Sequence, residues 1–268
     1  MIDASELVRQ ALAAARAGDH DARWDRIVDL QRRGGAEVLD QARRLCASRD
    51  RERRRLGVDI LGQLRAATAA DGMPRIGDPD HEAAMRILLD VAAHERDPDV
   101  LHALGIAFGH RHDPRGVPAL RRWRSHPDAD VRYTVAFGLL GLTDPSAIDT
   151  LIELSDDDDD NVRNWATFGL ARQVRTDTRA VRDALFARVA DPNADARAEG
   201  LIGMALRHDD RVVPMLLDAL TSPVWHGTAP HLVHDALHRM ARATGDPRLW
   251  YYVRHHPVWI RHASRDRG

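Results

Sequence analysis

The stretch NVRNWATFGLA, residues 161–171, is one copy of a pattern that recurs along the chain at intervals of about 31 to 36 residues. The copies are VLHALGIAFG from Val100, VRYTVAFGLL from Val131, VRNWATFGLA from Val162, ARAEGLIGMA from Ala196 and a weaker LVHDALHRMA from Leu232. An earlier copy, RRRLGVDILG from Arg53, stands 47 residues before Val100, because the segment ADGMPRIGDPD adds a loop. Self-similarity at such an interval indicates a repeat architecture.

Apart from the eighth position of the weaker last copy, each copy has small or apolar residues at its fifth, eighth and ninth positions, such as Val135, Gly138 and Leu139. This spacing follows one face of an α-helix. The eighth position often holds Gly or Ala, although Gly weakens a helix interior, so we expect helices to approach each other closely there. Further apolar-periodic segments lie between the copies, at residues 147–154, 180–189 and 211–220. The repeating unit is therefore predicted to be a helix, a short turn and a second helix.

An acidic or proline-containing phrase precedes each second helix: RDPD (96–99), HPDAD (126–130), DDDDD (156–160) and DPNAD (191–195). Proline cannot continue the preceding helix, and Asp is a preferred N-cap, so we expect the last Asp of each phrase to cap the following helix. The five aspartates occupy this slot, which favours Asp160 or its neighbour as a cap over a metal cage or a mimic of nucleic-acid phosphate. A calcium loop would also need a glycine and a distal glutamate, and neither is present.

The phrase D-x-x-V-R followed by spaced small residues resembles the HEAT repeat, in the short form of the phycobilisome-lyase-like HEAT class. The stretches RRRLGVDILGQL, NVRNWATFGLA and AEGLIGMALRHDDRVVPML are similar to the bacterial YibA-like proteins. The resemblance covers residues 35–245 in about six repeats, and it implies an all-α fold, an α-solenoid (superhelix) of antiparallel helix pairs. With helical caps expected at 1–34 and 246–268, the whole chain is predicted to be a single HEAT-like solenoid.

Three arginines follow the caps at one slot of successive repeats, Arg132, Arg163 and Arg197. Recurrence at one slot favours a structural ladder, in which each arginine pairs with an acidic residue of an adjacent turn such as Asp130 or Asp160, over an anion-binding site. The resemblance implies the same role, because HEAT proteins use this position in that way.

Composition places the chain of 268 residues among ordinary globular proteins, with 44% hydrophobic and 30% charged residues. All basic residues are Arg, and the net charge of -2 gives no overall attraction to nucleic acid. No run reaches the roughly 18 apolar residues of a membrane span, and the N-terminus lacks the pattern of a signal peptide. We therefore expect a cytoplasmic protein. The single cysteine, Cys46, excludes an intrachain disulfide and is expected to be buried.

The third and seventh positions of each second helix point away from the expected core and would be polar if they faced water. They are instead mostly aromatic or apolar: His102, Ile106, Tyr133, Phe137, Asn164, Phe168, Ala198, Ile202, His234 and His238, with Trp165 beside them. The HEAT resemblance implies that second helices line a concave surface, where such a row would form a binding groove. The alternative is that neighbouring helices bury each inner helix on both sides. The sequence leaves both interpretations open.

A metal site is the first alternative to a protein-binding groove, because histidine is abundant. His231, His234 and His238 share one helical face. HEAT-fold di-iron hydroxylases bind metal through repeated His-Glu pairs, but here such pairs occur only at 81–82 and 94–95, and not at matching slots of successive units. We therefore expect no metal ion and no cofactor.

A second alternative is a HEAT-fold DNA-binding protein, or an enzyme like the alkylpurine DNA glycosylases, in which Trp, Asp and Arg line the DNA groove. Trp165, Arg172 and Asp195 are residues of the right types. The near-neutral charge and the acidic run oppose this interpretation. A phosphate-binding glycine loop and a nucleophile elbow are both missing from the sequence, so no catalytic residue is predicted.

The favoured prediction is a non-enzymatic scaffold or adaptor that binds another protein through its concave face. By analogy with YibA-like proteins, some of which are encoded near Rhs-type polymorphic toxins, a toxin-immunity or regulatory role is a special case. Nucleic acid and membrane are not expected as partners. The predicted binding residues are His102, Ile106, Tyr133, Phe137, Asn164, Trp165, Phe168, Arg172 and Ile202.

Overall fold

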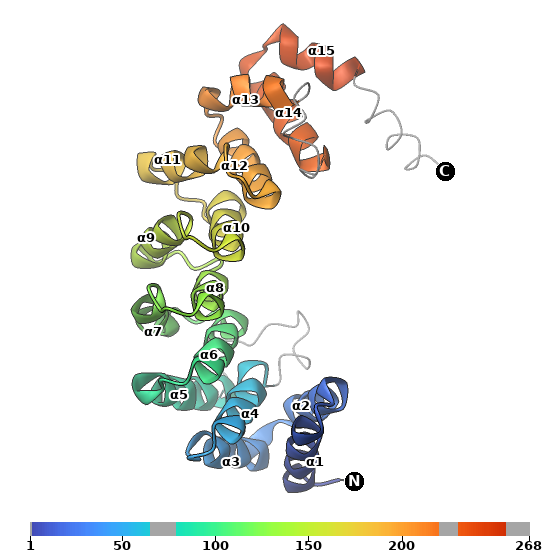
Figure 1. Ribbon diagram of the computed structural model, residues 1–268, viewed down its shortest axis with the longest axis vertical. Helices are drawn as coiled ribbons and strands as arrows, with labels where there is room; N and C mark the ends of the chain where they lie inside the picture. The colour runs from blue at the N-terminus through green and yellow to red at the C-terminus, as the bar shows by residue number, and fades with distance from the viewer. Residues whose placement is uncertain (1, 65–78, 220–229, 256–268) are drawn as a thin grey trace, which may run out of the picture. The chain divides into compact units, whose positions relative to one another are not determined.

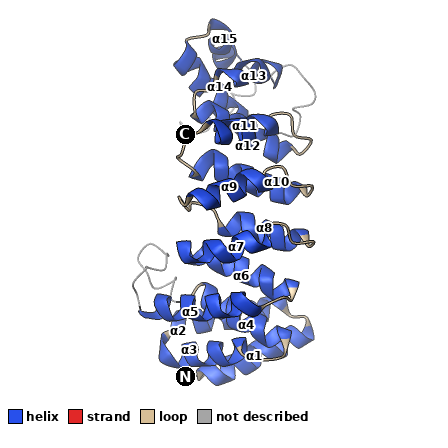
Figure 2. Cartoon of the chain, turned by 90° about the vertical axis from the view of Figure 1, so that its left-hand side faces the viewer, coloured by secondary structure: helices blue, strands red, loops and turns tan. Residues whose placement is uncertain are grey.

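A computed structural model describes residues 2–64, 79–219 and 230–255, which are helical with connecting turns and contain no β-strand (Figure 1, Figure 2). The helices are, in chain order, α1 (Ala4–Ala17), α2 (His20–Arg33), α3 (Gly35–Cys46), α4 (Arg51–Gly62), α5 (Pro79–His94), α6 (Pro98–Arg111), the 3-10 helix η2 (Pro114–Gly116), α7 (Val117–Trp123), α8 (Ala129–Gly138), α9 (Pro145–Leu154), α10 (Asp160–Phe168), the π-helix η3 (Gly169–Gln173), α11 (Arg179–Arg188), α12 (Ala194–Leu206), the 3-10 helix η4 (Asp210–Val212), α13 (Val213–Ala219), α14 (Pro230–Thr244) and α15 (Pro247–His255). In these ranges no helix combines the length and the apolar character of a membrane span. Most of the predicted loop at 70–80 lies outside the described residues.

The chain divides into two compact units, residues 1–147 and 148–268, with the boundary inside α9. The first unit contains the helix pairs α3–α4, α5–α6 and α7–α8. Its second helices α4, α6 and α8 pack side by side, and α3, α5 and α7 form the other layer. Helices α1 and α2 occupy the segment 1–34 that was expected to be a helical cap.

The second unit repeats this arrangement. Helix α12 packs between α10 and α14, while α11 and α13 cover α12 and α14 from the other layer. The all-α solenoid of HEAT-like helix pairs expected from the sequence is confirmed. That it forms a single solenoid with caps at 1–34 and 246–268 stays a prediction, because each unit is a compact body by itself.

The helix caps lie one or two residues before the last Asp of each phrase. Asp97, Asp128, Asp159 and Asn193 accept hydrogen bonds from backbone N–H groups of α6, α8, α10 and α12. The last Asp of each phrase, predicted to be the cap, belongs instead to the first turn of its helix, where it complements the positive helix end. For the acidic run, the cap is Asp159, which accepts from the N–H groups of Asn161 (2.9 Å) and Val162 (3.1 Å). The prediction of Asp160 or its neighbour is therefore confirmed.

Four second helices have an arginine four residues after the N-cap, and this arginine reaches back to the preceding turn. In four repeats its Nη1 donates to the backbone carbonyls six and five residues earlier: Arg54 to Ser48 and Arg49, Arg132 to His126 and Pro127, Arg163 to Asp157 and Asp158, and Arg197 to Asp191 and Pro192. Arg163 also pairs with Asp160 and, at 3.0 Å, with Asp191 of the next repeat. The structural role predicted for this slot is confirmed. Of the three predicted arginines, Arg163 shows the predicted acidic pairing, and the acceptors that all of them share are backbone carbonyls. The sequence prediction did not include Arg54.

Close approach of helices explains the glycines at the eighth position. A Cβ atom on Gly203 would lie 2.9 Å from Ala171 Cβ and 2.7 Å from Leu185 Cδ2, and one on Gly138 would lie 3.0 Å from Gly105 O. Such distances are shorter than van der Waals contact, so a larger residue must push helices apart.

Substitution of Gly203 by Ala tests this packing, because two effects predict opposite signs. Helix propensity favours Ala by about 1 kcal/mol, whereas overpacking costs about 1–3 kcal/mol. We expect overpacking to exceed propensity, so that urea denaturation shows a net loss of about 1 kcal/mol in the free energy of unfolding. Ala13→Gly on an exposed position of α1 calibrates the propensity effect. A more stable Gly203→Ala protein would contradict the packing argument.

Candidate partner-binding site

An aromatic pair lies on one face of α10. The three-residue spacing of Trp165 and Phe168 places their side chains on adjacent turns, and the rings meet edge to face with centroids 5.8 Å apart. Both side chains, and that of Asn164, are partly exposed. Val162 and Ala166 on the opposite side of the helix are fully buried. The predicted binding residues of α10 therefore lie on its outward face.

The first two turns of α12 complete a hollow beside this pair. Asn193 caps α12, so Asp195, Ala198 and Glu199 lie on one face at relative positions i, i+3 and i+4. These residues, with Asn164, Trp165 and Phe168, line a cavity of about 240 Å³, here termed the α10–α12 pocket. It combines aromatic walls with two carboxylates. Sequence reasoning did not assign Asp195 and Glu199 to the protein-binding face.

Arg172 lies at the edge of the α10–α12 pocket. It belongs to η3, the π-helix that continues α10, where Val174 N–H donates to Gly169 O. Its Nε donates to Glu199 Oε2 at 2.6 Å, and its guanidinium carbon lies 5.8 Å from the centroid of the Phe168 ring. The pocket edge therefore already holds one guanidinium between an aromatic ring and a carboxylate.

The predicted residues of the first unit lie on α6 and α8. His102, Ile106, Tyr133 and Phe137 are all partly exposed. The Phe137 ring meets His110 edge to face, with centroids 5.6 Å apart. Burial lowers the pKa of His102 and raises the pKa of the Tyr133 hydroxyl. These four side chains are part of the packing between helices and are also accessible from outside.

Ile202 is a correction to the predicted face. Its side chain is 1% exposed, because α12 packs against both α10 and α14, and it offers no surface to a partner. Whether a predicted face residue is open to a partner or buried in the core therefore differs from helix to helix. The positions on α6, α8 and α10 are partly open, whereas Ala198 and Ile202 on α12 are buried.

The histidines of α14 form no metal site with the residues that the structure describes. The rings of His234 and His238 have centroids 6.4 Å apart, and His238 meets Trp250 edge to face at 5.9 Å. Burial, and then the neighbouring His238, lower the pKa of His234. Within the described ranges, no three His, Cys, Asp or Glu side chains converge as metal ligands. The side chains of His231, His255 and His256 lie outside the described residues.

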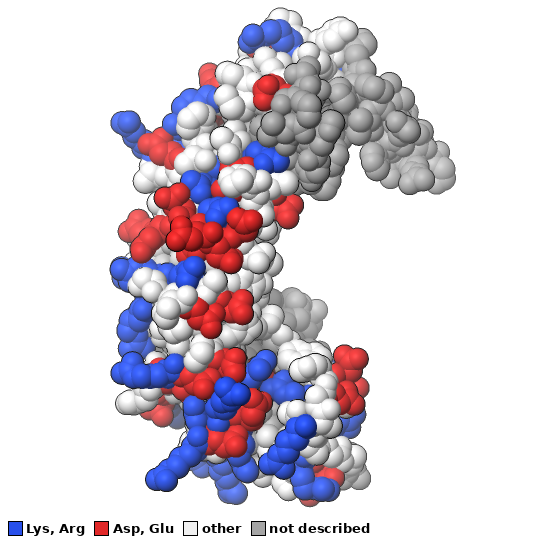
Figure 3. Space-filling model, viewed as in Figure 1, with Lys and Arg blue, Asp and Glu red and all other residues white. Residues whose placement is uncertain are grey.

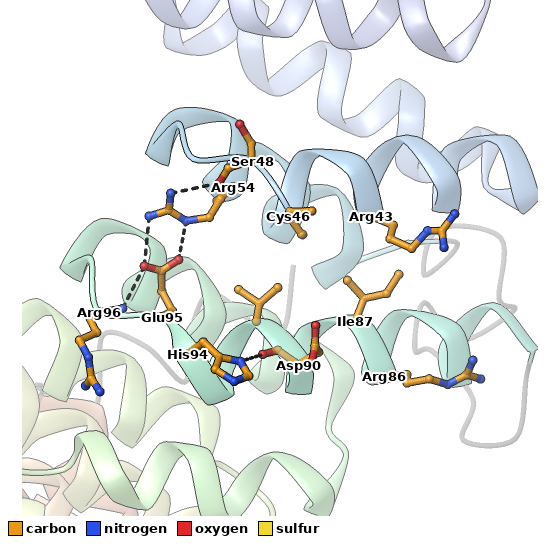
Figure 4. A pocket seen from close by; sticks show the side chains of 12 residues that line it. Arg43, Cys46, Ser48, Arg54, Arg86, Ile87, Asp90, His94, Glu95 and Arg96 are labelled. Atoms are coloured by element: carbon orange, nitrogen blue, oxygen red, sulfur yellow. Dashed lines mark hydrogen bonds and ion pairs between the residues drawn. The ribbon is translucent and has the colours of Figure 1, made fainter.

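A larger hollow of about 720 Å³ lies between α3 and α5 in the first unit (Figure 4). Figure 4 shows Arg43 and Arg86 at one end, and Arg54 with Glu95 at the other. Arg54 Nε and Nη2 donate to the two Glu95 oxygens at 2.7 and 3.1 Å. Burial raises the pKa of the Cys46 thiol to about 12, so the thiol is protonated at neutral pH and is no nucleophile. Arg54 and Glu95 are therefore engaged with each other, and Cys46 supplies no nucleophile to this hollow.

The acidic run is largely engaged in structure. Besides the Asp159 cap, Asp160 pairs with Arg163, and Asp156 accepts from Arg188 at 2.7 Å. Figure 3 shows acidic atoms gathered at the level of α9 and α10. Helix capping and intrachain ion pairs account for this concentration of carboxylates, as the sequence interpretation held.

Comparison with known proteins agrees with the HEAT-like fold. Residues 85–171 match the HEAT repeats family, so this part of the chain carries HEAT repeats. It is similar to Protein YibA of Escherichia coli strain K12, with 26% identity over 226 residues, which are 82% of this chain and 74% of YibA. The crystal structure of Escherichia coli YibA superposes with a TM-score of 0.70 at 24% identity, covering 94% of this chain and 86% of that one. An engineered protein superposes with a TM-score of 0.53 at 18% identity, covering 91% and 72%.

Proposed function

We propose that the chain is a non-enzymatic scaffold that binds a partner protein, and that the α10–α12 pocket is the centre of its binding surface. One observation carries the proposal: Trp165 and Phe168 are partly exposed beside a cavity, although both could have been buried in a helix pair. Aromatic residues in such hollows dominate the binding energy of many protein interfaces.

The repeat architecture supports the same function. Stacked helix pairs present extended surfaces, and their rigid helices hold side chains in fixed positions. Helix α10 is anchored by its Asp159 cap and by Arg163, and η3 at its end is held by Arg207. The aromatic pair is therefore preorganised, which reduces the entropy lost on binding.

Alanine at Trp165 is the direct test. We expect the partner identified by affinity purification and mass spectrometry from the native cell to bind the variant at least 10-fold more weakly in a reconstituted binding assay. A buried interface tryptophan contributes about 2 kcal/mol or more to such a complex. Phe168→Ala is expected to act in the same direction.

Trp24→Ala provides the matched control, since Trp24 is a tryptophan on α2 with 45% of its surface exposed. Circular dichroism should show that all three variants keep their helix content. If Trp165→Ala and Phe168→Ala both bound the partner with wild-type affinity, the α10–α12 pocket would not be the binding surface.

A toxin as the partner is a special case of this proposal. It is supported by the resemblance to YibA-like proteins alone, and a gene for a secreted toxin beside the gene for this chain would favour it. Protection of cells that express that toxin, lost in the Trp165→Ala variant, would establish it.

A base-excision role is the second candidate, because the structure gathers the three residues that suggested it. Trp165 and Asp195 line one pocket, and Arg172 lies at its edge. Glu199 holds the Arg172 guanidinium at 2.6 Å, however, which leaves less of its charge for a phosphate. Salt-dependent DNA binding in a gel shift at low ionic strength would support this candidate. Lack of binding under those conditions would remove it.

A further inference from the structure

We propose that the α10–α12 pocket receives an arginine side chain of the partner protein, with the guanidinium on Asp195 and the side chain against Trp165. This inference rests on the proposed function and specifies the chemistry of the partner. It is based on three observations: the two carboxylates in the lining, the intrachain guanidinium at the pocket edge and the size of the cavity.

The two carboxylates of the pocket differ in exposure and in whether an intrachain arginine already pairs with them. Glu199 is 9% exposed and accepts from Arg172 at 2.6 Å. Asp195 is exposed in the first turn of α12 and makes no ion pair with any residue that the structure describes. Asp195 is therefore the acceptor that a cation from outside can reach beside the aromatic walls.

Arg172 shows which group these surroundings accept. Its guanidinium lies over the Phe168 ring and on the Glu199 carboxylate. Trp165 and Asp195, which both line the pocket, offer the same two elements, a ring and a carboxylate. A guanidinium suits both, because it is planar, stacks on aromatic faces and donates through several N–H groups, whereas an ammonium is a more strongly hydrated point charge.

The size of the cavity limits the ligand to one side chain. Pockets for whole small molecules hold about 300–1,000 Å³, while this one holds about 240 Å³. An arginine brings an apolar stem for the aromatic walls and a cation for the carboxylate. An acidic side chain would meet two carboxylates, and a neutral polar one would leave the cationic position unfilled.

Short peptides test the inference without the unknown partner. The probes are acetyl-Gly-Arg-Gly-amide and the same peptide with citrulline, which has the shape of arginine without its charge. In NMR titrations of the full chain, we expect the arginine peptide to shift the Trp165 indole and Ala198 amide signals with a dissociation constant on the order of 1 mM. The citrulline peptide is expected to bind at least 5-fold more weakly, and a lysine peptide to lie between them.

The Asp195→Asn variant is expected to bind the arginine peptide at least 5-fold more weakly than the wild type. Asp130→Asn is the matched control, because Asp130 occupies the same first-turn slot on α8 and does not line the pocket. Equal binding of arginine and citrulline peptides, or wild-type binding by Asp195→Asn, would overturn the inference. It would also be overturned if a DNA oligonucleotide, but no arginine peptide, shifted these signals.

The partner assay separates this inference from the proposed function. If Trp165→Ala loses the partner while Asp195→Asn keeps it, the pocket binds the partner through another group and only the arginine assignment fails. If Trp165→Ala and Phe168→Ala both keep the partner with wild-type affinity, the pocket is not the proposed binding surface, whatever the peptides show.

Discussion

Replacing Arg207 by methionine is expected to lower the free energy of unfolding by about 3 kcal/mol. The side chain is 6% exposed. Its Nη2 donates to Leu170 O at 2.8 Å and Val174 O at 2.7 Å, and its Nη1 donates to Gly203 O at 3.1 Å. Methionine is also long and flexible but donates no hydrogen bond, so the carbonyls at the end of η3 would stay buried without a donor. Burial lowers the pKa of Arg207, and this cost of burying its charge keeps the expected loss moderate.

The same arrangement occurs in the first unit. The sequence RHDPR at 111–115 matches RHDDR at 207–211. Arg111 is 1% exposed and donates to Leu61 O and to Leu64 O, the latter at 3.2 Å, at the end of α4. In both units, the arginine satisfies carbonyls at the end of the preceding second helix. We therefore expect Arg111→Met to be at least as destabilising as Arg207→Met.

Hydrogen exchange with urea denaturation measures both losses, because exchange locates the destabilised helices. Arg207→Met should speed exchange mainly in α12 and η3, and Arg111→Met mainly in α4 and α6. Arg207→Lys keeps the charge with fewer donors, so its loss should be smaller. A loss below 1 kcal/mol for both methionine variants would show that these arginines are not needed for the carbonyls they contact.

The repeating helices could be predicted from sequence because their signal is periodic. The spacing of Val135, Gly138 and Leu139 depends only on helix geometry, and it recurs in each copy. The cap of the acidic run was predicted, but the other three caps lie two residues before the predicted Asp. An Asp in the first turn and an Asp at the N-cap both complement the helix end, so the phrase DPNAD does not by itself distinguish Asn193 from Asp195.

The RHDxR arrangement could not be recognised in the same way. It occurs in only two repeats of the chain, and its acceptors are backbone carbonyls, which leave no trace in the side-chain sequence. The aromatic half of the candidate site was predictable because its signal lies in the side chains themselves. Trp165 and Phe168 stand out as aromatic side chains on an outward face of their own helix.

The other half of the site depends on contact between repeats. Trp165 is the fourth residue of its copy, and Glu199 is the fourth residue of the next copy. Residues at equal slots of successive repeats lie side by side in a stack, so this register was the signal that could have placed Glu199, and with it Asp195, beside the aromatic pair.

Acidification is expected to destabilise the protein through Asp113 and Asp209. Burial alone would raise the pKa of Asp113, but hydrogen bonds from Arg115 and His81 exceed this effect and hold the pKa at about 2. Hydrogen bonds from Arg211 at 2.8 and 2.9 Å hold the pKa of Asp209 at about 2 against the effect of burial. Because both pKa values are lower in the folded state than in the unfolded state, each carboxylate stabilises the fold above about pH 4. This contribution is lost as the pH falls toward 2.

The expected size is about 2 kcal/mol for each aspartate. Urea denaturation between pH 6 and pH 2.5 should show most of this loss in the wild-type protein. The double variant Asp113→Asn and Asp209→Asn should be less stable at pH 6 but should change with pH by about 3–4 kcal/mol less. Other carboxylates with lowered pKa values remain in the variant, so the difference between the two curves isolates these two groups.

Asp210→Asn is the control, since Asp210 follows Asp209 directly, is exposed and makes no ion pair with a described residue. Its pH curve should run parallel to that of the wild type. Parallel curves for the wild type and the double variant would contradict the assignment. They would mean that the ion pairs of Arg115 and Arg211 with these carboxylates contribute little to the free energy of unfolding. The two buried aspartates would then stabilise the turns only as N-caps of η2 and η4.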